Sequence, residues 1–176
     1  MTTIPMHPVR AFVALGSNLS DPADQVNHAF SELDTLPDTR LIARSSLYRS
    51  APWGYADQPD FINAVAEIET RLDARTLLEM LLEIEHKRGR VREFLNSPRV
   101  LDLDLLLYGS LTHHEHGLTL PHPRMHERAF VLLPLTEIAP ECIIPGHGLA
   151  LECLVGCKGQ TLERLPTAAL QLQAAG

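Results

Sequence analysis

The sequence predicts an α+β fold whose strands and helices follow one another in the order βαββαβ. Four segments have the apolar composition of strands, and two others carry apolar residues at helical spacing. One helix follows the first strand, and the other separates the third strand from the fourth. This is the order of a ferredoxin-like sandwich. We therefore expect an antiparallel sheet with two helices on one face, followed by a C-terminal extension.

The first part of the chain predicts a strand, a helix and a second strand. Val9–Leu15 is apolar and ends in a Gly-Ser-Asn turn. A helix follows, with Ser20 or Asp21 as its cap and Pro22 in its first position. Leu41–Ala51 is the expected second strand, and it leads into a loop rich in proline, glycine and aromatic residues.

The third strand and the second helix have the clearest patterns. In residues 61–69 the even-numbered side chains are apolar, whereas the odd-numbered ones include Asn63 and two glutamates. Residues 73–89 predict a helix that Asp73 caps and that ends at Gly89. Because helices on one face leave the other face open, we expect Asn63 to lie where a ligand can reach it.

The last part of the chain predicts a fourth strand, Val100–Leu107, and then a histidine-rich loop. A helix from about Arg124 to Leu133 and a short helix within residues 146–156 are expected after it. We expect one domain over residues 1–176, with a core of about residues 9–158 and a tail that frays.

Composition restricts the classes of function. The formal net charge of −7 argues against a general nucleic-acid binder and against a protein that binds anionic membranes. The three cysteines and the lack of an apolar leader favour reduced thiols in a cytoplasmic protein. Five of the 15 basic residues nevertheless lie between Lys87 and Arg99, which indicates a local anionic ligand.

Asp102 and Asp104 are two positions apart in the fourth strand, so both carboxylates lie on one face. The interpretation without a function is that both carboxylates lie on a strand face that is exposed to solvent. The functional interpretation is a Mg²⁺ site, because this cation takes carboxylate and phosphate oxygens. Arg90, Arg92 and Arg99 lie just upstream and have the donors for phosphate, although a basic surface patch would carry the same residues. The combination favours a metal–nucleoside triphosphate site.

Further donors follow the fourth strand, and the segment 120–130 contains His122, Arg124, His126 and Arg128. On one helix, Arg124 and Arg128 would share a face. A zinc site is the weaker interpretation, because His113, His114 and His116 lie in an expected loop without a nearby cysteine.

Aromatic residues indicate a flat heterocyclic ligand. Phe61 shares a strand face with Asn63, Phe130 lies in the helix after the basic segment, and Trp53 and Tyr55 lie in the proline-rich loop. Rings stack on such a ligand while an amide bonds its edge. Core packing is the alternative for Phe130.

In these residues the chain resembles the 6-hydroxymethyl-7,8-dihydropterin pyrophosphokinase family of folate biosynthesis. The resemblance runs from about Val9 to Cys142. It rests on "ALGSNL", "SSLYRSAPWG", "DQPDFINAV", "IEHKRGRVR", "PRVLDLDLLLYG" and "LTLPHPRMHERAFVLLPLTEIAP". It implies a ferredoxin-like fold and transfer of pyrophosphate from ATP to the pterin hydroxymethyl group, with release of AMP and the use of two Mg²⁺. ATP and the pterin are the partners it implies; we expect no nucleic acid, membrane or obligate protein partner.

The resemblance also implies roles for individual residues. Asp102 and Asp104 would bind both metal ions and, with Arg90 and Arg99, form the catalytic group. The residues implied at ATP are Glu85, Arg90, Arg92, Arg99, Leu105, Thr119, His122 and Arg128. The residues implied at the pterin are Ser50, Ala51, Trp53, Phe61, Asn63 and Phe130. The loops Arg90–Pro98 and Pro52–Asp60 would close over both ligands.

The sequence departs from the family pattern at Glu93, Leu95, Asn96, Ser97 and Pro123. Two other functions compete with this one. A nucleotidyltransferase would combine a Gly-Ser turn with an Asp-x-Asp strand, but here these elements are far apart in the sequence. A regulatory module that binds a small ligand would explain the fold but not the aspartates beside clustered arginines.

Overall fold

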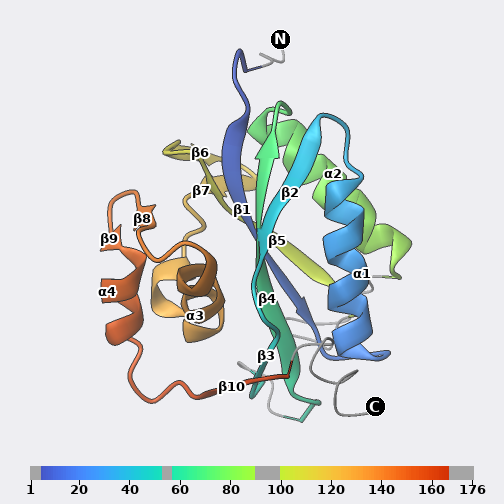
Figure 1. Ribbon diagram of the computed structural model, residues 1–176, viewed down its shortest axis with the longest axis vertical. Coiled ribbons are helices and arrows are strands. Elements are labelled where there is room, and N and C mark those ends of the chain that lie inside the picture. Colours follow the sequence, from blue (N-terminus) through green and yellow to red (C-terminus); the bar gives the residue numbers. More distant parts are fainter. Residues whose placement is uncertain (1–4, 53–56, 90–99, 167–176) are drawn as a thin grey trace.

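A six-stranded antiparallel sheet forms the centre of the molecule (Figure 1), which is described by a computed structural model over residues 5–52, 57–89 and 100–166. Its strands lie in the order β10-β3-β4-β1-β5, and β2 also pairs with β4. The bounds are β1 Val9–Ser17, β2 Thr39–Arg44, β3 Tyr48–Ser50, β4 Phe61–Thr70, β5 Asp102–Tyr108 and β10 Leu162–Arg164. The predicted α+β class is confirmed, and β10 is an addition that the sequence did not indicate.

Two helices cover one face of the sheet, as predicted. Helix α1 spans Pro22–Asp34 and α2 spans Ala74–Lys87, and both lie on the same side of the sheet in Figure 1. The core beneath them contains alternate residues of β1 and β4, among them Val13 and Ile68. Burial of such apolar surface is the main stabilising contribution to the fold.

The helix ends follow the sequence signals, with one difference. Asp73 caps α2 by accepting a hydrogen bond from the Thr76 backbone N–H at 2.8 Å. Gly89 follows α2 with φ of 80°, a conformation that glycine adopts without strain. Asp21 precedes α1 in the left-handed region, and its side chain makes no capping hydrogen bond.

The expected second strand, Leu41–Ala51, is wrong as a single element. It is divided into β2 and β3, which pair with different stretches of β4. The division falls at Ser45, whose backbone N–H donates to the Val65 carbonyl and whose hydroxyl accepts from the Val65 N–H, both at 2.9 Å. The Ser45 hydroxyl thus takes the place of a backbone carbonyl as the acceptor for the Val65 N–H, and the regular ladder of backbone hydrogen bonds ends there.

A third helix corrects the expectation that the opposite face is open. Helix α3, Ala129–Ile138, packs on this face over Phe12 and Val65, and Figure 1 shows it across the sheet from α1 and α2. The odd-numbered side chains of β4 include an apolar residue at this point, which gives α3 a surface to bury. Only the part of the face beyond α3 is left for a ligand.

Shorter elements complete the structure. The hairpin of β8 (Ile143–Ile144) and β9 (Gly148–Leu149) leads into α4, Ala150–Val155, which packs against α3. Within the described ranges, no helix combines the length and the hydropathy needed to cross a membrane.

Two expectations for the segment after β5 are also wrong. The histidine-rich loop contains a strand, β6 (His113–Glu115), which pairs with β7 (Leu118–Leu120). The helix expected from about Arg124 is a short 3-10 turn, η1 (Met125–Glu127), followed by α3. Arg128 has extended backbone between the two, so Arg124 and Arg128 do not share one helix face.

Candidate active site

Three polar positions of the predicted site lie on one face of the sheet, in two adjacent rows across β4, β1 and β5. Gly16 of β1 pairs with Asn63 of β4 on one side and with Asp102 of β5 on the other. Ala14, two residues back, pairs with Asp104 in the same way. Paired residues of antiparallel strands point to the same face. The structure therefore brings Asn63, Asp102 and Asp104 to one face, at the end that α3 does not cover.

Gly16 leaves room at the middle of the row Asn63–Gly16–Asp102. A Cβ atom built at this position would lie 3.3 Å from Oδ1 of Asn63, which is closer than ordinary contact. A glycine within a strand commonly marks a close approach of this kind. At Gly16 only the backbone of β1 therefore lies between the amide of Asn63 on β4 and the carboxylate side of the site on β5.

The donor set on β5 fits a hard divalent cation. Asp102 and Asp104 are both half-buried, and each presents carboxylate oxygens on the same face. In residues 5–52, 57–89 and 100–166, no group of three or more His, Cys, Asp or Glu side chains is arranged to hold a metal. Two carboxylates suit Mg²⁺, which takes its remaining oxygens from water and substrate phosphate. They do not suit a structural zinc site, which needs four protein ligands.

Glu85 fixes the strand between the two aspartates. Its side chain comes from α2, is only 1% exposed, and accepts a hydrogen bond from the Leu103 backbone N–H at 2.8 Å. In the described sheet, β5 is an edge strand, and such a strand has N–H groups that no neighbouring strand can bond. Glu85 satisfies one of these groups at the residue between Asp102 and Asp104.

His122 lies beside β5 as a neutral ring. Its backbone N–H donates to the Leu106 carbonyl at 2.9 Å. Burial lowers the pKa of His122 to about 4; the nearby Arg128 acts in the same direction, and Asp102 opposes them. At neutral pH the imidazole therefore provides a hydrogen-bond donor without a charge, while Arg128 provides the positive charge.

The other end of the row is neutral and tightly hydrogen-bonded. Asn63 and Ser50 are 6% and 7% exposed, and Nδ2 of Asn63 donates to Oγ of Ser50 at 2.6 Å. Ser50 of β3 pairs with Phe61, the half-buried first residue of β4. The structure thus brings Ser50, Phe61 and Asn63 together.

The remaining predicted site residues are placed less closely or lie outside the described ranges. Leu105 is 5% exposed and belongs to the core under α1 and α2, on the face opposite to Asp104. Thr119 is half-buried in β7, and Ala51 is exposed after β3. Phe130 lies in the first turn of α3, 5.6 Å below the Arg128 guanidinium. Trp53, Arg90, Arg92 and Arg99 lie outside the described residues, as do the whole predicted closing loop Arg90–Pro98 and residues 53–56 of the loop Pro52–Asp60.

Comparison with known proteins identifies the family of the chain. The family model for 7,8-dihydro-6-hydroxymethylpterin-pyrophosphokinase matches residues 12–140. The chain belongs to this family. A pyrophosphokinase of Pseudomonas aeruginosa that acts on 2-amino-4-hydroxy-6-hydroxymethyldihydropteridine is 46% identical over 159 residues, which cover 90% of this chain and 98% of that relative. The Haemophilus influenzae enzyme of the same name is 45% identical and covers 82% of this chain and 90% of its own length.

Solved structures agree in fold at much lower identity. The HPPK-DHPS protein of Plasmodium falciparum, carrying A437G and bound to SDX-DHP, has a TM-score of 0.69 at 13% identity, over 95% of this chain and 50% of that one. The wild-type protein with pteroate has a TM-score of 0.67 at 14% identity and covers 85% and 42% of the two chains. This chain therefore spans about half of those longer proteins or less, and the likeness shows the fold.

Family membership establishes the type of reaction. The pyrophosphokinase is an ATP-dependent diphosphotransferase of folate biosynthesis. The regulatory-module and nucleotidyltransferase alternatives are thereby set aside. From the sequence, Gly16 was expected in a turn, with a role only in the nucleotidyltransferase alternative, although a glycine at the end of a strand is also a signal of close packing.

Proposed function

We propose that the face shared by Asp102, Asp104 and Asn63 is the active site of this pyrophosphokinase. There the β,γ-diphosphate of ATP passes to the hydroxymethyl oxygen of 6-hydroxymethyl-7,8-dihydropterin, and AMP leaves. The observation that carries the proposal is the paired row Asn63–Gly16–Asp102. It sets a neutral amide on β4 and a carboxylate on β5, the two strands that flank β1, and Gly16 places no side chain between them.

Asp102 and Asp104 would hold two Mg²⁺, and the arrangement of these carboxylates on one strand face supports that role. When bound, the ions would neutralise the negative charge of the triphosphate and the charge on the oxygens of the P–O bonds that form and break during the transfer. The residues themselves contribute position. Glu85 keeps the backbone of β5 in place, so the two carboxylates are arranged before substrates arrive. We further propose that a carboxylate oxygen of Asp102 helps to accept the proton of the attacking hydroxyl group.

His122 and Arg128 would contact the triphosphate beside β5. A neutral imidazole donates one hydrogen bond, and a guanidinium adds a permanent charge with paired donors. Arg90, Arg92 and Arg99 are proposed to add charge of the same kind. Glu85, Leu105 and Thr119 are proposed near the nucleoside.

Ser50, Phe61, Asn63 and Phe130 would bind the pterin, together with Ala51 and Trp53. The amide of Asn63 has a donor and an acceptor for the edge of a heterocycle, and its orientation is fixed by Ser50. The aromatic rings of Phe61 and Phe130 supply flat surfaces for stacking. This half of the site is neutral, as a neutral ring system requires.

Product identity tests the proposed reaction. The protein is incubated with ATP, Mg²⁺ and hydroxymethyl-dihydropterin, and the nucleotides and pterins are separated and identified by mass. The proposal requires AMP and the pterin diphosphate in equal amounts. ADP as the nucleotide product, or release of pyrophosphate with transfer of the nucleotide, would contradict it.

A further inference from the structure

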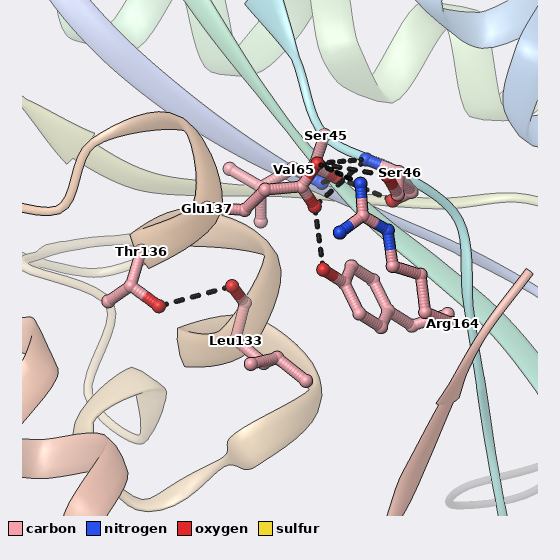
Figure 2. Close-up of polar contacts among 8 residues, drawn as sticks. Ser45, Ser46, Val65, Leu133, Thr136, Glu137 and Arg164 are labelled. Atoms are coloured by element: carbon pink, nitrogen blue, oxygen red, sulfur yellow. Dashed lines mark hydrogen bonds and ion pairs between the residues drawn. The ribbon is translucent and has the colours of Figure 1, made fainter. Parts of the chain in front are cut away.

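The carboxylate of Glu137 is contacted by hydrogen-bond donors from three separate segments of the chain. It is the next-to-last residue of α3, and its side chain is only 23% exposed. Figure 2 shows it directed from α3 towards Ser46 and Arg164. A carboxylate accepts several hydrogen bonds at once, so a single side chain can hold all three segments against the helix.

The donors come from the link between β2 and β3, from β3 and from β10. The Ser46 backbone N–H lies 3.1 Å from each carboxylate oxygen, and the Ser46 hydroxyl donates to Oε2 at 2.9 Å. The Tyr48 hydroxyl donates to Oε1 at 2.6 Å, and Arg164 of β10 lies 3.4 Å from Oε2. These contacts leave little freedom for the start of β3 relative to α3.

Tyr48 is well suited to be a permanent donor in this group. Its side chain is buried, and burial together with the hydrogen bond to Glu137 raises the pKa of the phenol well above its usual range. The hydroxyl therefore stays protonated at neutral pH. The neighbouring Ser45 is fixed as well, because it exchanges hydrogen bonds with Val65 of β4.

The strand that Glu137 holds leads directly into the proposed pterin half of the site. Tyr48 pairs with Asn63 across β3 and β4, and Ser50 pairs with Phe61. The helix that carries Glu137 carries Phe130 at its other end. One carboxylate thus links the two elements that present pterin-binding side chains, β3 and α3, and no described contact connects it to β5.

We propose that Glu137 is a positioning residue for pterin binding, which fixes β3, and through it Ser50 and Asn63, at a set distance from Phe130 on α3. The proposal rests on the proposed function, since it assumes that these residues bind the pterin. Glu137 itself contacts no substrate in this account. Its loss is therefore expected to weaken pterin binding without weakening ATP binding.

The test compares Glu137→Gln and Tyr48→Phe with the wild type, in steady-state kinetics and in calorimetric titration of each substrate. An amide in place of the carboxylate keeps the size of the side chain but turns an N–H group towards donors. We expect the KM for the pterin to rise about tenfold in Glu137→Gln, the scale of one lost hydrogen bond to a charged group. The KM for ATP and the kcat at saturating pterin should stay within about twofold of wild type on the same scale.

Arg49→Ala is the matched control. Arg49 lies between Tyr48 and Ser50 on β3 and forms an exposed ion pair with Glu163 of β10, so the substitution alters the same strands without touching Glu137. It should leave both KM values unchanged. If Glu137→Gln does not fold, Tyr48→Phe decides, because it removes only one hydroxyl and should raise the pterin KM about threefold.

Two results would overturn the proposal. One is an unchanged pterin KM in both folded variants, and the other is an equal rise in the KM values for pterin and ATP. Asn63→Ala separates this failure from a failure of the proposed site. If Asn63→Ala weakens pterin binding while Glu137→Gln and Tyr48→Phe do not, the site stands and the positioning role is wrong. If Asn63→Ala has no effect either, the proposed pterin site itself is wrong.

Discussion

The two halves of the proposed site differ in how their groups are held. The proposed nucleotide half contains Asp102, Asp104, His122 and Arg128. The proposed pterin half contains Ser50, Phe61, Asn63 and Phe130. The carboxylates of the nucleotide half are half-buried on an edge strand. The amide and hydroxyl of the pterin half are almost fully buried and bonded to each other.

This difference follows from the chemistry of the two ligands. Like charges two residues apart repel each other, and a bound cation removes that repulsion, so partial exposure on β5 suits carboxylates that a cation from solvent can reach. A neutral ring offers no charge to drive binding, and it is held by shape and by correctly oriented hydrogen bonds. We therefore expect substitutions on β5 to affect the chemical step most, and substitutions around Asn63 to affect pterin affinity most.

The largest effect is expected for Asp104→Asn. The variant keeps the shape of the side chain but removes a negative charge from the proposed metal site, so kcat should fall by about 10³-fold, the scale of one lost preorganised electrostatic contact. The measurement is turnover at saturating ATP and pterin, with the folded state checked by circular dichroism. Asp24→Asn, on the exposed surface of α1, is the matched control. Near-normal turnover in Asp104→Asn would show that the nucleotide half has been misplaced.

Asn63→Ala should have the next largest effect, confined to the pterin half. The variant loses the edge hydrogen bonds to the ring and leaves the Ser50 hydroxyl without its amide donor. We expect the pterin KM to rise by about 10- to 100-fold and the ATP KM to change little. Titration of each substrate in turn provides the comparison. Equal losses for both substrates would mean that the two halves are not separate.

A smaller effect is expected for Gly16→Ala, because Gly16 lies on β1 between the proposed nucleotide half and the proposed pterin half. The added Cβ would lie 3.3 Å from Oδ1 of Asn63 and not within that distance of any β5 atom. The amide must therefore shift by a few tenths of an ångström, which we expect to raise the pterin KM about threefold. Steady-state kinetics with each substrate limiting in turn will measure the KM for the pterin and the KM for ATP. A larger change in ATP binding than in pterin binding would contradict the account.

His122 should contribute a pH dependence of stability and not of phosphate binding. Its pKa in the folded protein is about 4, below the value of about 6.5 for a free histidine. The unfolded chain therefore takes up the proton first, and the contribution of His122 to stability, complete above about pH 6.5, is lost as the pH falls towards 4.

Denaturant unfolding of the wild type and His122→Gln between pH 4 and 7.5 measures this contribution. The wild type should lose more stability than the variant over this range, by about 3 kcal/mol at most. His116→Gln, at an exposed position, should behave as the wild type. Parallel curves for the wild type and His122→Gln would show that the histidine is not held neutral by burial.

The sequence predicted those elements whose patterns are local. Alternation in residues 61–69 and the caps of α2 are visible within a few residues, and so is the spacing of Asp102 and Asp104. The covering of the second face by α3 was missed because this helix is apolar over most of its surface, so its sequence shows no clear stripe that would indicate which side packs on the sheet. The division at Ser45 depends on its contact with Val65, which no pattern within the strand reveals.

Contacts between distant residues explain the rest of the difference. Glu137 is separated from its donor Ser46 by 91 positions, and Glu85 from Leu103 by 18. Such pairs depend on tertiary structure, and neither residue type nor spacing indicates them. The site residues themselves could be proposed from the sequence, whereas the groups that hold them in position required the structure.

Binding of Mn²⁺ as a paramagnetic substitute for Mg²⁺ is the most direct test of the central claim, that Asp102 and Asp104 form the metal site next to the pterin half. Electron paramagnetic resonance would count the ions bound in the presence of a non-hydrolysable ATP analogue. The account predicts two Mn²⁺ per wild-type chain, fewer in Asp104→Asn, and two in Asn63→Ala. An unchanged count in Asp104→Asn would contradict it.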